Sequence, residues 1–169
     1  MAGSTSLLKS MLENNQKGFC EMNIFLSFTP EYAIHAAELL FTIREHSCNP
    51  LDVHMLVDSE SPEKVLPMFK LLNLQNCEYH VYSSSLLYSI LSPMHSSGLV
   101  HKMTYGKLLA VKLLTDKDKV LCLDVDMLVV RDGLDELYRS DLGTRYAAVV
   151  EETSVEAFAK DEMQKCGVK

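Results

Sequence analysis

Lys119-Val-Leu-Cys-Leu-Asp-Val-Asp126 is the stretch that decides the fold. Its first half is an almost continuous apolar run, which is typical of a strand buried on both faces of a parallel sheet. The run ends in two carboxylates, Asp124 and Asp126, separated by one valine. An unpaired carboxylate at the edge of an apolar sheet is costly to desolvate. We therefore expect a positive group beside these two acids.

Upstream of this strand, strand-like and helix-like segments alternate. Three further strands are predicted, at Asn23 to Phe28, Leu51 to Val57 and Cys77 to Tyr82. Three helices are predicted between them, at Glu31 to about His46, from Ser61-Pro62-Glu63 to Leu72, and at Val100 to Thr115. A repeated strand-helix unit with apolar strands predicts a doubly wound α/β fold, in which helices flank a mostly parallel sheet.

Two finer expectations concern the segment before Asp124. Residues 83–97 read as an irregular polar connection. The helix that follows carries a stripe at helical spacing, made of Met103, Lys107, Ala110, Val111 and Leu114.

The expected strands end where a ligand site would form. Phe28-Thr29, Val57-Asp58 and Asp124-Val-Asp126 all fall at carboxyl ends of strands. Ligands of doubly wound sheets bind outside those ends. The sequence therefore predicts a site that includes Asp124 and Asp126.

Composition limits the classes of partner. The chain has 169 residues, of which 47% are apolar, enough for one sizeable core. Its formal charge of −7 and pI near 5.3 oppose binding to nucleic acid or to an anionic membrane. No apolar run approaches the roughly 20 residues that span a bilayer. We expect a flexible leader at residues 1–21, one domain at 22–169 and a cytoplasmic location, or the Golgi lumen if a leader or anchor is missing.

The cysteines give no disulfide or zinc signature. There are five of them, an odd number, and no Cys-x-x-Cys pair. Cys77 and Cys122 lie in strand-like runs and are expected to be small core residues.

Three interpretations of Asp124 and Asp126 compete. Mn²⁺ or Mg²⁺ would accept both carboxylate and phosphate oxygens and bridge a diphosphate to the protein. Alternatively the acids only cap the turn, with Asp132 capping a short helix at Gly133 to Tyr138. An aspartyl-nucleophile phosphatase also has an Asp-x-Asp after a strand, but it needs a lysine and further acids on later strands.

The flanking segments favour the first interpretation. Lys107-Leu-Leu-Ala-Val-Lys-Leu-Leu114, together with Asp118-Lys-Val-Leu-Cys-Leu-Asp-Val-Asp126, resembles the central block of glycosyltransferase family 8, the glycogenin family. The resemblance extends from Met22 to Glu151 and so covers most of the chain after residue 21. It implies a GT-A fold and the transfer of a hexose or pentose from a UDP-sugar to a carbohydrate or protein-linked acceptor hydroxyl, with retention of configuration.

The resemblance also implies roles at the diphosphate. Asp124 and Asp126 match the acids that hold Mn²⁺ against it, and Val125 offers its backbone to the ribose. Lys107 matches a basic residue directed at the phosphates, although a solvated lysine is the alternative.

Further matches concern the nucleoside. Phe28, Thr29 and Tyr32 lie at the first strand-to-helix turn, which grips the uridine, with the Tyr32 ring as a stacking surface. Tyr32 could instead pack on the sheet with its hydroxyl outward. Met103 matches a position lining the nucleotide pocket, but methionine at helical spacing is also common in cores.

Several functional alternatives remain open. In the family, the acceptor site and a third metal ligand, a histidine, follow the region matched here. We therefore expect the amino-terminal part of the fold, truncated before them. The histidines at 35, 46, 54, 80, 95 and 101 all precede Asp124, and each is read as a surface or core residue. A nucleotide-sugar-binding module without transfer, a fold-only relative with structural aspartates, and a homodimer all stay open, and no catalytic nucleophile is predicted.

Overall fold

A computed structural model describes residues 20–91 and 102–149. By its contacts the chain divides into two units, one ending at Arg139 and one beginning at Ser140. The expected leader at 1–21 lies almost entirely outside the described residues. No described helix is long and apolar enough to cross a membrane.

A parallel four-stranded sheet forms the centre of the first unit. Its strands are β1 (Met22–Phe28), β2 (Leu51–Val57), β3 (Cys77–Ser83) and β4 (Leu121–Leu123), in the order β3-β2-β1-β4. Each pairing is parallel, with Met22 opposite Leu51, Leu51 opposite Cys77 and Ile24 opposite Leu121. The predicted strands and parallel sheet are confirmed, although β4 is shorter than the expected Lys119 to Leu123.

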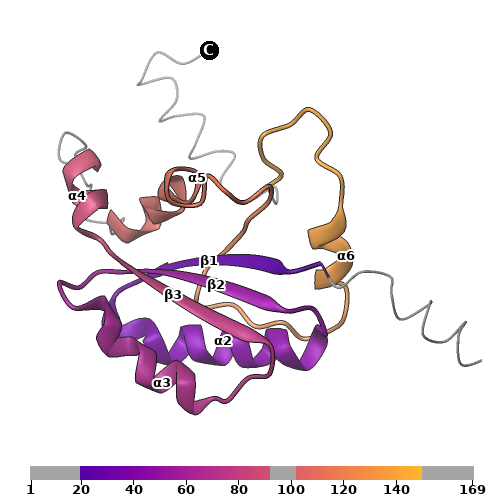
Figure 1. Ribbon diagram of the computed structural model, residues 1–169, viewed down its shortest axis with the longest axis horizontal. Coiled ribbons are helices and arrows are strands. Elements are labelled where there is room, and N and C mark those ends of the chain that lie inside the picture. Colours follow the sequence, from indigo (N-terminus) through magenta and orange to yellow (C-terminus); the bar gives the residue numbers. More distant parts are fainter. Residues whose placement is uncertain (1–19, 92–101, 150–169) are drawn as a thin grey trace, which may run out of the picture. The chain divides into compact units, whose positions relative to one another are not determined.

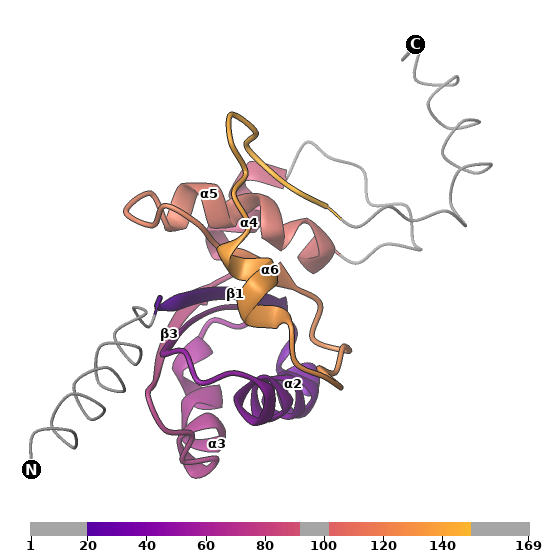
Figure 2. The same ribbon diagram turned by 90° about the vertical axis from the view of Figure 1, so that its right-hand side faces the viewer.

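Helices cover both faces of this sheet, as Figures 1 and 2 show. One face carries α2 (Ala33–His46), entered through the turn η1 (Pro30–Tyr32), and α3 (Leu66–Leu71), entered through η2 (Pro62–Val65). The other face carries α4 (Ser85–Leu91), η3 (Lys102–Leu109) and α5 (Ala110–Leu113). The helix α6 (Leu134–Arg139) follows β4. The doubly wound arrangement is therefore confirmed.

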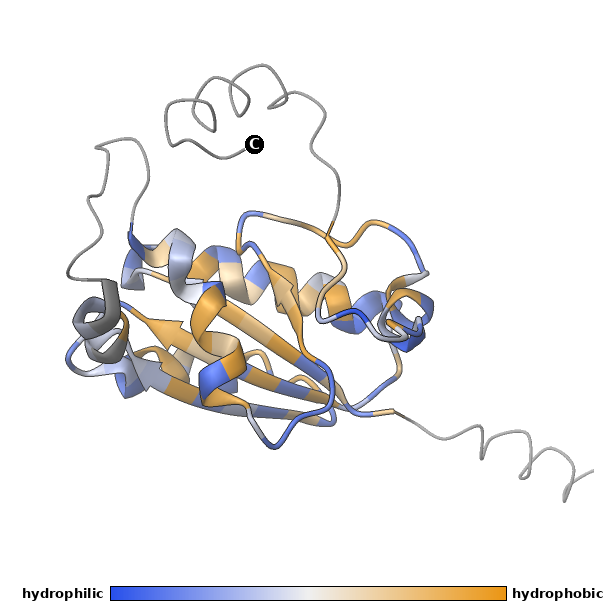
Figure 3. Ribbon diagram, turned by 90° about the horizontal axis from the view of Figure 1, so that it is seen from above, coloured by the Kyte–Doolittle hydropathy of each residue, from blue (hydrophilic) through white to orange (hydrophobic). Residues whose placement is uncertain are grey.

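Each face has its own apolar core. On the α2 side, alternate strand residues such as Ile24, Leu26, Val53 and Met55 are fully buried. They meet the buried face of α2, which consists of Ala33, Ala36, Ala37, Leu39, Leu40 and Ile43. On the opposite side, Phe25 and Leu56 pack against Met103, Leu109, Ala110 and Leu114. The strands accordingly stand out as mainly apolar in Figure 3.

The segment before β4 differs from its prediction in two ways. Residues 85–91 form the helix α4 rather than an irregular connection. The expected helix at 100–115 is a 3-10 helix from Lys102 to Leu109 and an α-helix only from Ala110 to Leu113. Its buried residues Met103, Gly106 and Leu109 are three apart, which matches the three-residue turn of a 3-10 helix. The predicted stripe was wrong at Val111, which is exposed.

Three smaller expectations are also corrected. Asp132 does not cap α6, because that helix begins at Leu134. Its carboxylate instead lies 2.9 Å from Nδ1 of His46. Cys77 and Cys122 are only partly buried, at the margins of the two cores.

The second unit is described only for residues 140–149. These residues form turns without helix or strand. The Gly143 N–H donates to the Asp141 carboxylate at 2.8 Å, and the Arg145 N–H donates to the Leu142 carbonyl at 3.0 Å.

Candidate functional site

The order of the strands locates the candidate site. The chain runs outward from β1 to β2 and β3, then returns to place β4 on the other side of β1. This reversal is a topological switch point, where doubly wound sheets bind ligands at the carboxyl ends of the strands. Thr29 follows β1 there and Asp124 follows β4.

The two acids lie at this edge as expected, and one of them, Asp124, has a basic partner. Asp124 directly follows β4, and Val125 and Asp126 form the turn after it. Lys107 on η3 brings its Nζ to 2.7 Å from Oδ1 of Asp124. The Asp124 side chain is 60% exposed and that of Lys107 33% exposed, so a ligand could reach both. The predicted positive group beside Asp124 is therefore Lys107.

The first strand-to-helix turn follows β1 at the same edge of the sheet. Thr29 is half-buried, and its hydroxyl makes no capping hydrogen bond, although it occupies the N-cap position of η1. Tyr32 is 50% exposed, and its ring centroid lies 5.5 Å from that of His35. The ring is therefore accessible to a planar ligand.

Three of the predicted donor-binding residues have buried side chains. Phe28 packs in the α2-side core, with its ring centroid 6.3 Å from that of Phe69. Met103 belongs to the opposite core, as the alternative interpretation had it. Val125 is buried beside the α2-side cluster, which leaves its backbone for a ligand. Donor contacts by Phe28 and Val125 are thus restricted to main-chain atoms.

The carboxyl end of β2 holds a polar group around Asp58, to which the sequence pattern assigns no role beyond its place at a strand end. Asp58 accepts hydrogen bonds from the Ser84 hydroxyl at 2.7 Å and from the Tyr88 hydroxyl at 2.5 Å. Burial, together with this bond to Asp58, raises the pKa of Tyr88 to about 12. The Lys102 ammonium lies 5.5 Å from the centroid of the Tyr88 ring. Asp58 therefore fixes α4 to the sheet near the site.

The Asp124 region has the donor chemistry of a divalent-cation site. Both carboxylates are exposed, and Asp126 makes no hydrogen bond or ion pair with another described residue. Carboxylate oxygens suit Mg²⁺ and Mn²⁺, which are hard cations that keep several other oxygen ligands. Among the described residues, no histidine or third acid joins these two as a ligand group. One such group of three exists elsewhere, at Asp52, His54 and His80.

The fold and the site define a class of protein. A parallel sheet with Asp-x-Asp after the strand beyond the switch point is the architecture of GT-A glycosyltransferases. The sequence profile of Glycosyl transferase family 8 matches residues 23–167. The chain belongs to this family.

Solved structures show the same fold. One is the apo bifunctional glycosyltransferase WbbM, with a TM-score of 0.65 and 24% identity over 83% of this chain and 25% of that one. Another is the galactosyltransferase LgtC in complex with donor and acceptor sugar analogues, with a TM-score of 0.64 and 22% identity over 88% of this chain and 52% of that one. A third is apo GlyE of Streptococcus pneumoniae TIGR4, with a TM-score of 0.55 and 16% identity over 86% of this chain and 39% of that one. The chain therefore spans about half the length of LgtC and a smaller share of WbbM and GlyE. A search of curated proteins found no match.

Proposed function

We propose that this chain binds the nucleotide-sugar donor of a metal-dependent glycosyltransferase. The reaction would transfer a hexose or pentose from a UDP-sugar to an acceptor hydroxyl, with retention of configuration. The observation that carries the proposal is the 2.7 Å contact between Lys107 Nζ and Asp124 Oδ1 at the switch point of the sheet.

A diphosphate explains why a lysine and two acids gather at this edge. Lys107 would bind a phosphate oxygen, while Asp124 and Asp126 would hold Mn²⁺ or Mg²⁺ on the same diphosphate. The ion would supply positive charge against the charge that develops on the departing nucleoside diphosphate. Lys107 adds a second fixed positive group in the same place. The lysine would thus bind the diphosphate directly, and the two acids would bind the cation that accompanies it.

The first turn is suited to the nucleoside. Tyr32 presents a half-exposed ring on which a uracil could stack, and Thr29 offers a hydroxyl without a capping bond. Val125 would contribute its backbone to the ribose. Thr29, Tyr32 and Val125 are therefore proposed as nucleoside contacts, with Phe28 restricted to its backbone.

Family membership supports transfer to an acceptor, and the LgtC complex contains both donor and acceptor sugar analogues. Retention of configuration rests on the family resemblance alone. A binding module without transfer is the alternative. Product analysis with UDP-glucose, UDP-galactose and UDP-xylose distinguishes them, since a binding module would take up donor without consuming it.

The test is a calorimetric titration of UDP into the folded chain, with and without Mn²⁺. We expect binding that depends on Mn²⁺ and is abolished in Asp124→Ala/Asp126→Ala. Asp118→Ala, which removes an exposed acid from the turn before β4, is the matched control and should bind as the wild type does. Equal UDP binding with and without Mn²⁺, or unchanged binding in the double variant, would contradict the proposal.

A further inference from the structure

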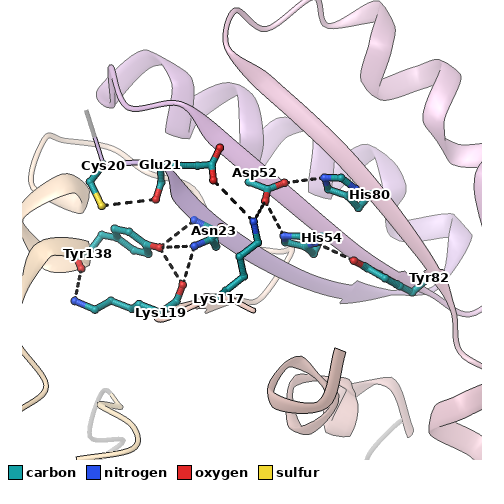
Figure 4. A network of polar contacts seen from close by, with 10 residues as sticks. All are labelled: Cys20, Glu21, Asn23, Asp52, His54, His80, Tyr82, Lys117, Lys119 and Tyr138. Carbon is teal, nitrogen blue, oxygen red and sulfur yellow. Dashed lines mark hydrogen bonds and ion pairs between the residues drawn. The ribbon is translucent and has the colours of Figure 1, made fainter. Parts of the chain in front are cut away.

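A cluster of titratable side chains lies on the opposite half of the sheet, away from the candidate donor site. Asp52 and His54 are alternate residues of β2 and so share one face, and His80 of β3 lies directly opposite His54 in the parallel register. Asp52 Oδ1 is 2.9 Å from His80 Nε2, and Asp52 Oδ2 is 3.1 Å from His54 Nε2. Figure 4 shows both rings turned toward the carboxylate.

These short contacts have ion-pair distances, but they do not have the geometry of hydrogen bonds. Asp52 Oδ1 and His54 Nε2 are buried, and neither has a hydrogen-bond partner despite the distances. The side chains of Asp52 and His54 are only 6% and 4% exposed, so water does not readily supply the missing hydrogen bonds. Buried polar atoms without partners are rare in native proteins and call for an explanation, such as an ion.

The second ring nitrogen of His54 is already engaged. His54 Nδ1 lies 3.0 Å from the Tyr82 hydroxyl. If Nδ1 carries the proton, the Nε2 lone pair faces a carboxylate, which is repulsive. If Nε2 carries it, a buried N–H is left without an acceptor in line. A cation between the groups removes both penalties, and a hydrogen bond to the other nitrogen is the usual support for a metal-bound histidine.

We propose that Asp52, His54 and His80 form a zinc site, with one Asp52 oxygen and Nε2 of each histidine as ligands. Two imidazoles on a tetrahedral zinc, with Zn–N about 2.0 Å, have ring centroids about 5 Å apart. The His54 and His80 centroids are 4.9 Å apart, but the two ring planes are only 16° from parallel, so the His80 ring must turn for both Nε2 atoms to face one ion. The three ligand atoms lie within 4.8 Å of one another, and ligands of such a zinc are about 3.3 Å apart. His80 has 45% of its side chain exposed, so it can close that gap and admit the ion.

Lys117 compensates the same carboxylate. Its Nζ lies 2.7 Å from Asp52 Oδ2 and 3.9 Å from Glu21 Oε2. Burial alone would raise the pKa of Asp52, but the hydrogen bond from Lys117 and the neighbouring charges lower it. The 2.7 Å contact with the Lys117 ammonium pairs Asp52 as a carboxylate, which is the form that would bind a metal. The Lys117 ammonium would repel a cation at this site, so its removal should strengthen zinc binding.

This site is distinct from the proposed donor site in place and in chemistry. Asp52 is in register with Asn23, whereas Asp124 follows Leu123, which is in register with Leu26. Three residues along a strand are about 10 Å. Two imidazoles and one carboxylate suit zinc, whereas the Asp124 region offers only oxygen, which suits Mn²⁺ or Mg²⁺. The zinc proposal therefore does not depend on the proposed function.

The test uses the full chain, freed of metal with a chelator, and zinc ions alone. Zinc is titrated by calorimetry, metal content is measured after dialysis, and Co²⁺ replaces zinc to report tetrahedral coordination by its visible absorption. We expect one zinc per chain and an affinity at least about tenfold weaker in His80→Asn. His80 is half-exposed, so this variant should fold, and circular dichroism confirms it.

Two controls make the result specific. His35→Asn removes a half-exposed histidine of α2 and should leave zinc binding unchanged. Asp124→Ala/Asp126→Ala should also retain zinc, while Lys117→Gln should bind it more tightly. Absence of zinc binding by the folded wild type, unchanged affinity in His80→Asn, or loss of zinc in Asp124→Ala/Asp126→Ala would overturn the proposal.

Discussion

Gly106 of η3 lies directly on Ser27 of β1. A Cβ placed on Gly106 would stand 2.6 Å from Cβ of Ser27 and 2.7 Å from its Oγ, closer than real Cβ atoms approach. The Ser27 hydroxyl donates to the Met103 carbonyl at 2.7 Å and so fastens η3 at the same point. The absence of a side chain at residue 106 therefore allows η3 to pack this close to β1. It also sets the position from which Lys107 reaches Asp124.

Gly106→Ala should destabilise the chain by about 1–3 kcal/mol, because an added methyl group in a filled space forces the backbone apart. It should also weaken binding of UDP with Mn²⁺, since Lys107 moves with η3. Urea unfolding and calorimetry measure the two effects. In a double-mutant cycle, Ser27→Gly should cost less in the Gly106→Ala background than in the wild type, because it removes the atom nearest to the added Cβ. Additive costs would contradict this account.

Lys107→Ala should weaken binding of UDP with Mn²⁺ by about ten- to a hundredfold, since hydrogen bonds to charged groups contribute about 1.5–3 kcal/mol. Mn²⁺ alone should bind no more weakly, because Asp124 is released from its ion pair. Lys112→Ala is the matched control, as Lys112 is an exposed lysine of α5. Equal UDP affinity in the two variants would exclude a phosphate contact by Lys107.

The parallel sheet was predictable because strong local patterns determine it. Four apolar runs, each followed by a turn, are typical of buried parallel strands, and the structure has a strand at each of them. The 3-10 form of η3 was not predictable, since it depends on the close approach of Gly106 to β1. Nor was α4, whose bond from Tyr88 to Asp58 joins residues 30 positions apart in the sequence.

The two clusters of charged groups, at Asp124 and at Asp52, also differ in how far the sequence predicts them. Asp124 and Asp126 are separated by a single residue and follow a strand, so their exposure at the sheet edge could be predicted. His54 and His80 are 26 residues apart, and only the β2–β3 register places them opposite each other. The only local signal was that Asp52 and His54 are alternate residues of one strand. This places them on one face of the sheet but does not indicate His80 as their partner. Single histidines were therefore read as unrelated.

The pKa of Tyr88 gives a test at alkaline pH. Its folded value of about 12 lies above the ordinary value of 10.0, because burial and the bond to Asp58 disfavour the phenolate. The contribution of this hydroxyl to stability is therefore complete below pH 10 and is lost as the pH rises through about 12. The tyrosinate absorbance of the wild type minus that of Tyr88→Phe should show this late ionisation. In an Asp58→Asn background the difference should move to lower pH, and an unmoved difference would exclude Asp58 as a cause.

Tyr138 joins α6 to β1 through a fully used hydroxyl. This oxygen accepts from the Asn23 backbone N–H at 3.1 Å and from Asn23 Nδ2 at 3.0 Å, and it donates to the Lys119 carbonyl at 3.0 Å. Figure 4 shows the three groups around it. Tyr138→Phe keeps the ring but leaves the buried Asn23 N–H without this acceptor, which should cost about 1–3 kcal/mol.

Urea unfolding of Tyr138→Phe measures that cost. Tyr32→Phe is the matched control: it removes the same atom from a half-exposed ring, and a surface change of this kind should stay within about 0.5 kcal/mol. Because Asn23 lies in β1 and Lys119 lies just before β4, the loss should also loosen the pairing of these two strands, which positions Asp124. Faster amide exchange at Ile24 to Leu26 in Tyr138→Phe alone would show this effect. Equal stability of the two variants would mean that water replaces the hydroxyl at no cost.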